Sequence, residues 1–133
     1  MNLTELLSDG PYKETYRKAM IIWSDERRAV DPGVYCREAS KNITKTTVIV
    51  SDIRRKADIK WFKETFGDKI KLVRIFCPES LRIERGWKFT KGIDDIQSEC
   101  DLDDFHDWDL LVENDGKKEI DEILGTIEDF LKA

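Results

Sequence analysis

The sequence predicts an α/β fold, an open parallel sheet with flanking helices, formed by one domain over residues 1–133. Short runs that are apolar on both faces, as in buried parallel strands, alternate along the chain with segments whose apolar residues recur at helical spacing. The composition is 40% hydrophobic with four Trp, which is enough apolar material for one core at this length. No internal repeat, low-complexity segment or linker divides the chain.

The first half of the chain predicts three helices and one strand. The helices are expected over residues 12–29, 34–41 and 54–66, and the strand over the β-branched run at residues 46–50. Asp31-Pro32-Gly33 ends the first helix, and Gly67-Asp68 ends the third. Ser51 and Asp52 follow the strand directly.

The second half predicts two further strands and a final helix. The strands are the apolar runs at residues 71–77 and 108–113, and between them lie a short helix over residues 79–85 and a long polar stretch over residues 86–106. From Ile120 onward, apolar residues recur at i, i+3 and i+4, which predicts an amphipathic helix. Because ligands of open parallel sheets bind beyond the carboxyl ends of the strands, the residues that follow each strand are the candidates for a site.

Charge is distributed unevenly along the chain. Residues 92–133 hold 15 Asp and Glu and 3 Lys, whereas residues 1–91 hold 20 Lys and Arg and 13 Asp and Glu, and the net charge is −5. A basic front part is compatible with a nucleic acid, a phosphorylated small molecule or solubility alone. Nucleic acid is disfavoured, because the overall charge is negative and the basic residues gather at strand ends.

Two arginines stand where a helix is expected to begin. Arg54 and Arg55 follow the predicted strand at residues 46–50. A helix N-terminus carries roughly half a positive charge, so cations are disfavoured there unless an anion is held in front of them. We therefore expect the pair to bind an anionic ligand.

Other basic residues form weaker patterns. At about 100° per residue, Lys13, Arg17 and Arg28 fall within an arc of about 60°, which indicates either an anion-binding face or a solvated basic face. Arg82 and Arg85 begin a segment, about residues 79–106, that is suited to closing over a phosphate as a lid. Arg74 lies within a predicted strand, where it pairs with an acid or serves the site.

Several function classes are not supported. No run of about 18 apolar residues occurs and the first residues lack a signal-peptide pattern, so no membrane span and a cytosolic (cytoplasmic) location are expected. The three Cys are odd in number and widely spaced, which favours reduced structural thiols. The acidic run over residues 101–109 lacks the spacing and glycine of an EF-hand loop, so a solvated face and no protein metal site are expected. His106 has no nucleophile in its sequence context and is not expected to be catalytic.

Segments along nearly the whole chain resemble, in order, the animal-type phosphomevalonate kinases. The most specific are Val50-Ser-Asp-Ile-Arg-Arg, Arg85-Gly-Trp-Lys-Phe-Thr-Lys-Gly-Ile-Asp-Asp and Ser98-Glu-Cys. The resemblance implies a P-loop (nucleoside-monophosphate) kinase-like fold. It also implies transfer of the γ-phosphoryl group of ATP, with Mg²⁺, to (R)-5-phosphomevalonate, giving 5-diphosphomevalonate for isoprenoid and sterol synthesis.

The resemblance implies roles for individual residues as well. The acceptor-binding residues it implies are Lys13, Arg17, Arg28, Arg37, Arg54, Arg55 and Asn114, and of these Arg54 and Arg55 are the expected catalytic residues. Arg82, Arg85 and Asp115 correspond to ATP-binding positions, and Arg74 to a functional arginine without an assigned role. A ring of arginines suits a reaction in which one phosphate attacks another, because the charge of the transition state is spread over oxygens.

One departure from the family is large. The family begins with a strand and a phosphate-binding loop, whereas this sequence contains no Gly-x-x-x-x-Gly-Lys, so the first βα unit of the fold is expected to be missing. The resemblance places that strand between those expected at residues 46–51 and 71–77. The alternative to an active enzyme is a truncated isoform or fragment that binds a phosphorylated ligand or a partner without turnover. In either case a monomer is expected.

Overall fold

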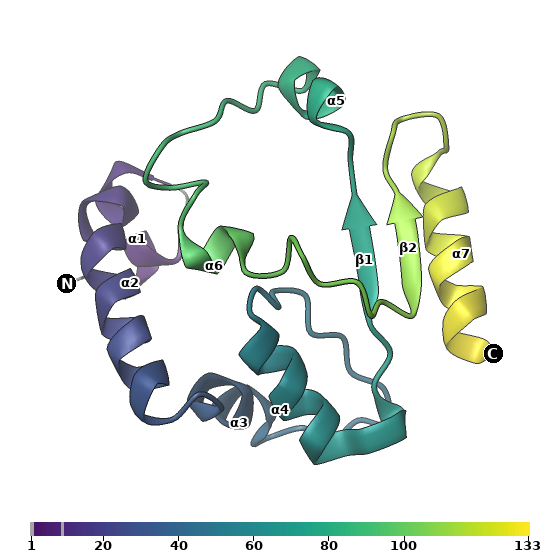
Figure 1. Ribbon diagram of the computed structural model, residues 1–133, viewed down its shortest axis with the longest axis horizontal. Helices are drawn as coiled ribbons and strands as arrows, with labels where there is room; N and C mark the ends of the chain where they lie inside the picture. Colours follow the sequence, from purple (N-terminus) through teal and green to yellow (C-terminus); the bar gives the residue numbers. More distant parts are fainter. Residues whose placement is uncertain (1, 9) are drawn as a thin grey trace. The chain divides into compact units, whose positions relative to one another are not determined.

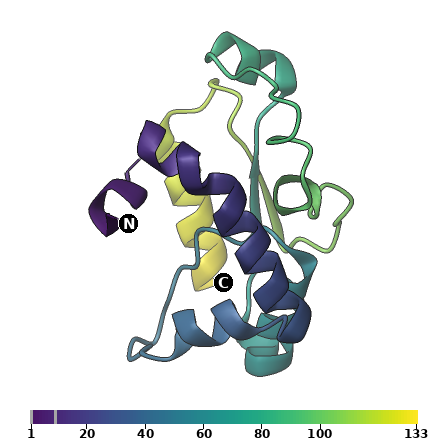
Figure 2. The ribbon, with the colours of Figure 1, turned by 90° about the vertical axis from the view of Figure 1, so that its left-hand side faces the viewer.

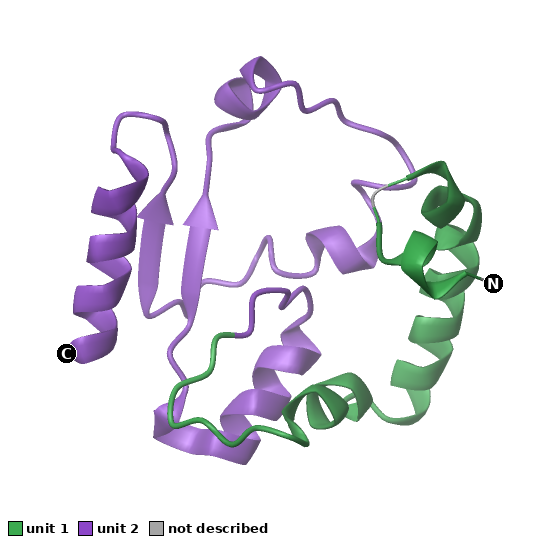
Figure 3. Ribbon diagram, turned by 180° about the vertical axis from the view of Figure 1, so that it is seen from behind, with its two compact units in different colours: residues 1–49 green, residues 50–133 purple. Residues whose placement is uncertain are grey.

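The computed structural model describes residues 2–8 and 10–133, and the chain divides into two compact units, residues 1–49 and residues 50–133 (Figure 3). Together they form a mixed α/β chain with a two-stranded parallel sheet. The mixed class and the parallel sheet confirm the sequence prediction. That the chain forms a single domain stays a prediction.

Unit 1 is helical. It contains α1 (Leu3–Leu6), α2 (Pro11–Val30) and α3 (Val34–Ser40), so both helices expected in this part of the chain are confirmed (Figure 1). Proline is favourable at the first position of α2, where its missing N–H would have no helical partner. At the end of α2 the Asp31 side chain accepts a hydrogen bond from the Gly33 N–H at 3.2 Å, which fixes the turn into α3.

Unit 2 contains the other helices. They are α4 (Lys56–Phe66), the 3₁₀ turn η1 (Gly67–Lys69), α5 (Glu79–Glu84), α6 (Gln97–Cys100) and α7 (Ile120–Lys132). Gly67 ends α4 with a φ of 58°, a conformation that favours glycine, as the predicted stop requires. Glu119 and Glu122 form a reciprocal capping box at the start of α7. The short helix α6 interrupts the polar stretch for which the sequence predicted no regular structure.

The sheet consists of β1 (Val73–Phe76) and β2 (Leu110–Glu113). The strands are parallel, with Val73 opposite Leu110 and Phe76 opposite Glu113, so their carboxyl ends meet at one edge. In two views at right angles α5 lies beyond the carboxyl end of β1, and α7 runs alongside the sheet (Figures 1 and 2). The sheet therefore brings the segment after β1 near the segment after β2.

The prediction of a strand over residues 46–50 is wrong. This segment forms no ladder in the part of the chain that the structure describes, and Ile49 is 81% exposed. A β-branched run becomes a strand only where a neighbour pairs with its N–H and C=O groups, and none of the described residues does so. The helix expected from Arg54 begins two residues later, at Lys56.

The core of unit 2 is small. Ile59, Phe62 and Val112 are buried, whereas Ile75 and Leu111 are 57% and 59% exposed. The expectation that the strands are buried on both faces is therefore wrong for the described residues. Burial of both faces requires elements packed on each side, and a sheet of two strands carries too few of them. None of the described helices is both long and apolar enough to cross a membrane.

Candidate functional site

The start of α4 gathers charged groups of both signs. Arg55 is the N-cap residue, with extended backbone, and Arg54 precedes it. The Arg54 guanidinium donates from Nε to Asp52 Oδ1 at 2.7 Å and from Nη1 to Glu99 Oε1 at 2.6 Å. These carboxylates raise the pKa of Arg54, the hydrogen bond to Asp52 having the largest effect. The cation that the sequence singled out is therefore held between two carboxylates.

The acidic segment after α6 reaches the same helix. Asp101 Oδ2 accepts a hydrogen bond from the Lys56 backbone N–H at 2.8 Å, at a helix end that favours negative charge. Lys56 Nζ lies 2.6 Å from Asp104 Oδ1, and Lys63 pairs with Asp107. The run expected to be a solvated face is exposed, and its carboxylates also bind basic residues of α4. Among the described residues, no group of three or more His, Cys, Asp or Glu could hold a metal ion.

Arg74 of β1 contacts the same acidic segment. Its Nη1 donates to the Leu102 carbonyl oxygen at 3.1 Å, its Nη2 lies 3.8 Å from Asp103 Oδ1, and its guanidinium lies over the Trp108 ring at 5.6 Å. The pairing with an acid is one of the two roles that the sequence left open for a strand arginine.

The carboxyl end of the sheet brings Arg85 and Asn114 together. Arg85 Nη1 lies 3.2 Å from the Asn114 carbonyl oxygen and 3.4 Å from Asn114 Oδ1, and it is 3.6 Å from Cys77 Sγ. A Cβ atom at Gly116 would lie 3.2 Å from Arg85 Nη2, so glycine gives the guanidinium room. Arg85, the C-cap residue of α5, and Asn114, which directly follows β2, are both predicted site residues and meet at this edge.

Asp115 follows Asn114 but is engaged locally. Its carboxylate lies 2.9 Å from Lys117 Nζ, and the hydrogen bond from Lys117 lowers the pKa of Asp115. Asp115 is thus ionised and held by a neighbouring cation.

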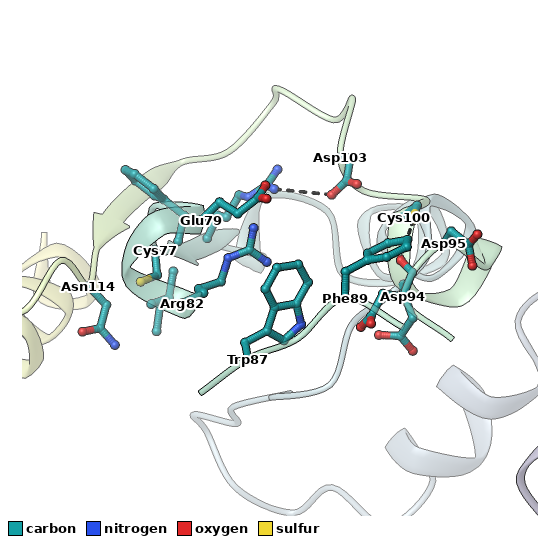
Figure 4. Close-up of a pocket in the computed structure, with 14 residues that line it drawn as sticks. Cys77, Glu79, Arg82, Trp87, Phe89, Asp94, Asp95, Cys100, Asp103 and Asn114 are labelled. Carbon is teal, nitrogen blue, oxygen red and sulfur yellow. Dashed lines mark hydrogen bonds and ion pairs between the residues drawn. The ribbon is translucent and has the colours of Figure 1, made fainter. Parts of the chain in front are cut away.

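A hollow of about 670 Å³ lies beside the strand ends in unit 2 (Figure 4). Its lining includes Arg74, Arg82, Trp87, Asp94 and Asn114. The Arg82 guanidinium lies 4.6 Å from the centre of the Trp87 ring, and Figure 4 shows the two side chains next to one another. The hollow combines cations, carboxylates and an aromatic face, which suits a charged ligand with a planar group.

The other predicted site residues belong to unit 1. The continuous helix α2 confirms that Lys13, Arg17 and Arg28 share one stripe. Arg17 donates two hydrogen bonds to Glu14, from Nε to Oε2 at 2.8 Å and from Nη2 to Oε1 at 2.6 Å, and this pairing lowers the pKa of Glu14. Arg28 lies over the Tyr35 ring at 4.9 Å.

Arg37 lies on the next helix of the same unit. It pairs with Asp31, and that hydrogen bond lowers the pKa of the Asp31 carboxyl group. The aspartate that ends α2 thus holds a predicted site arginine of α3.

Sequence reasoning missed the carboxylates that hold these cations. Asp52 and Glu99 bind Arg54, and Asp101 lies at the first turn of α4. The signal for Glu99 was present, because Ser98-Glu99-Cys100 is one of the specific family-like segments. Its partner lies 45 residues away, which spacing does not reveal.

Comparisons with known proteins agree with the resemblance. The family model described as phosphomevalonate kinase matches residues 1–68. A phosphomevalonate kinase of Drosophila melanogaster is 50% identical over 121 residues, which cover 86% of this chain and 64% of that protein. A UPF0200/UPF0201 protein of Archaeoglobus fulgidus is 35% identical over 92 residues, covering 64% of this chain and 27% of that protein. The chain spans less than two thirds of the length of these curated relatives.

Proposed function

The chain belongs to the phosphomevalonate kinase family, and we propose that it acts in the transfer of the γ-phosphoryl group of ATP to (R)-5-phosphomevalonate. The observation that carries the proposal is the placement of Arg54 and Arg55 directly before the first turn of α4, in a chain 50% identical over 121 residues to a phosphomevalonate kinase. The two parallel strands with site residues at their carboxyl ends support a nucleoside-monophosphate-kinase-like fold.

The start of α4 suits the acceptor phosphate. Backbone N–H groups at a helix N-terminus point toward an anion, and adjacent guanidinium groups add charge and paired donors. Arg54 and Arg55 in this role would hold the phosphate and stabilise the charge that develops on its oxygens during attack. The chain's own part in the reaction is positioning and electrostatic stabilisation, as phosphoryl transfer requires.

The carboxyl end of the sheet suits the donor. The sequence contains no Gly-x-x-x-x-Gly-Lys. On the strength of the family resemblance, Arg82, Arg85 and Asp115 are the residues of this chain proposed to contact ATP. Asn114 lies within 3.4 Å of Arg85 and is proposed at the acceptor, which would bring donor and acceptor contacts to one edge of the sheet.

The residues of this chain fit a metal only as part of the ATP complex. Mg²⁺ in kinases is held by substrate phosphates, water and one or two carboxylates rather than by a protein cage. The described residues offer no metal cluster of their own, but Asp94 and Asp95 line the hollow beside the strand ends. A bound Mg²⁺ would neutralise charge on the ATP phosphates. Either carboxylate could act as a ligand through its second oxygen, because one oxygen of Asp94 accepts from the Thr90 N–H and one of Asp95 from the Gly92 N–H.

The basic residues of unit 1 are proposed acceptor ligands on the strength of the family. Lys13, Arg17, Arg28 and Arg37 correspond to acceptor-binding positions, and a dianionic phosphate with a separate carboxylate offers enough acceptor atoms for several of them. The monomeric state and the cytosolic location stay predictions.

An ADP-release assay tests the proposal. The full chain is incubated with Mg-ATP and phosphomevalonate, and ADP formation above the rate without acceptor is expected. Arg54→Met should lower kcat by about 100-fold or more, because a donor to a developing oxyanion is removed. Arg27→Met, on an arginine without a proposed role, serves as the matched control and should leave the rate unchanged.

The outcomes separate the proposed enzyme from its alternative. Turnover that is lost in Arg54→Met supports the enzyme. A folded chain that binds phosphomevalonate in calorimetry but releases no ADP is instead a binding module, and a near-normal rate in Arg54→Met would refute the role of Arg54.

A further inference from the structure

Two carboxylates of one short segment occupy the anion-binding end of α4. Glu99 Oε1 lies 2.6 Å from Arg54 Nη1, and Asp101 Oδ2 lies 2.8 Å from the Lys56 backbone nitrogen. Both come from 45 residues further along the chain. The groups that a phosphate would bind are therefore engaged by anions that belong to the protein.

The hydrogen-bond capacity of Arg54 shows what these contacts prevent. A guanidinium has five N–H donors, and a phosphate binds it best through two parallel hydrogen bonds along one edge. Asp52 accepts from Nε and Glu99 accepts from Nη1, so two of the three nitrogen atoms of the guanidinium already donate to carboxylates of the protein. Of the two carboxylates, Asp52 is two residues from Arg54, whereas Glu99 is on α6 and can leave with its segment.

We propose that Glu99 competes with the acceptor phosphate for Arg54. When the phosphate binds, it displaces Glu99 from Arg54 and thereby releases the segment around α6. This rests on the proposed role of Arg54 as a phosphate ligand. At equal distance a dianion is attracted about twice as strongly as a carboxylate, so a phosphate can replace Glu99. The exchange lowers the apparent affinity for the acceptor and couples its binding to movement of residues 97–107, which are also tied to α4 through Lys56 and Lys63.

Phosphate binding by Glu99 variants tests the competition. Inorganic phosphate at pH 8 is the probe, and its dissociation constant is measured by ³¹P NMR titration for the full chain without ATP. Glu99→Gln should tighten binding by about twofold to fivefold, the range expected for an exposed ion pair. Glu128→Gln makes the same charge change on an exposed glutamate of α7 that pairs with Lys132, and should leave the constant unchanged.

A double substitution locates the effect at Arg54. In the Arg54→Gln background, Glu99→Gln should no longer alter phosphate binding, because the guanidinium for which Glu99 and phosphate compete has been removed. The gain in the single variant should also shrink at 0.5 M NaCl, since salt screens the exposed charges. Unchanged or weaker binding in Glu99→Gln, or an equal gain in the Arg54→Gln background, would overturn the proposal. Far-ultraviolet circular dichroism and a thermal melt verify that each variant is folded.

Hydrogen exchange tests the release of the segment. Saturating phosphate should speed amide exchange in residues 97–107 of the unmodified chain, and in Glu99→Gln the exchange should already be fast without phosphate. Slower or unchanged exchange in the unmodified chain would contradict the release. These readouts use no ATP, so their failure is distinct from a failure of the ADP-release assay, which bears on the proposed function alone.

Discussion

Several basic residues of unit 2 pair with residues far along the chain, whereas Arg17 and Arg37 of unit 1 pair with near neighbours in the sequence. In unit 1, Arg17 pairs with Glu14 three residues away and Arg37 with Asp31 six residues away. In unit 2, Arg54 reaches Glu99 over 45 residues, and Arg85 reaches Asn114 over 29. Local pairs form wherever their helix forms, whereas long-range pairs form only when the unit folds. The long-range contacts of unit 2, unlike its local ion pairs, therefore depend on its tertiary structure.

The largest effect is expected from removing the main aromatic of the small core in unit 2. Phe62 is 7% exposed and its ring lies 5.1 Å from Trp61 and 6.0 Å from Phe66. Phe62→Ala should lower the free energy of unfolding of unit 2 by about 3–5 kcal/mol, as loss of a buried ring does. Urea denaturation with hydrogen exchange measures it, and residues 97–107 should lose protection together with α4.

The exposed Phe89 supplies the control. Its side chain is 58% exposed, so Phe89→Ala should change the free energy of unfolding by about 0.5 kcal/mol or less. If residues 97–107 keep their protection when Phe62→Ala unfolds α4, then the long-range pairs do not depend on the core and the comparison fails.

A smaller effect is expected from reversing one long-range pair. Lys63→Glu places a like charge beside Asp107 and should cost about 1 kcal/mol of stability, and adding Asp107→Lys should restore most of it. The control is Lys60→Glu, whose partner Glu64 is one helical turn away. The measurement is the urea midpoint, and a double variant no more stable than Lys63→Glu would show that the pair does not form in solution.

The smallest effect is the response to acid. Hydrogen bonds from Arg37 and Lys56 lower the pKa values of Asp31 and Asp104 respectively. A carboxyl group whose pKa is lower in the folded state contributes stability above its unfolded pKa, near 4, and the contribution is lost as the pH falls through the folded value. Stability should therefore decline below pH 4, with a shallower decline in Asp31→Asn and Asp104→Asn, measured as the urea midpoint between pH 7 and pH 3. Equal slopes in the variants would contradict these pKa directions.

Local patterns in the sequence predicted α2, α3, α4, α5 and α7 and two of the strands because their causes are local, whereas the four-residue helices α1 and α6 were not predicted. Apolar spacing gives α2 and α4, and Gly67 with its φ of 58° ends α4 where the sequence placed a stop. The run at residues 46–50 has strand propensity without a partner, and pairing is a property of the whole fold. Sequence alone therefore could not distinguish it from the strand at β1.

The candidate site divides in the same way. Helix electrostatics predicted an anion at Arg54, and carboxylates of the protein do lie there, whereas binding of an anionic ligand stays a prediction. That one of these carboxylates belongs to Glu99 required the fold, because no spacing rule links residues 45 positions apart. That Arg85 and Asn114 lie near each other could be expected, since both follow parallel strands. The contact of 3.4 Å between Arg85 Nη1 and Asn114 Oδ1 could not be predicted from the sequence.

The two-stranded sheet has a practical consequence for anyone who handles this protein. Within the described residues β1 and β2 pair only with each other, so each strand has one edge whose backbone donors and acceptors lack a strand partner, and Ile75 and Leu111 stand exposed beside them. Such edges recruit strands from other molecules at high concentration. Dilute samples and early light-scattering checks are therefore advisable before crystallisation or long titrations.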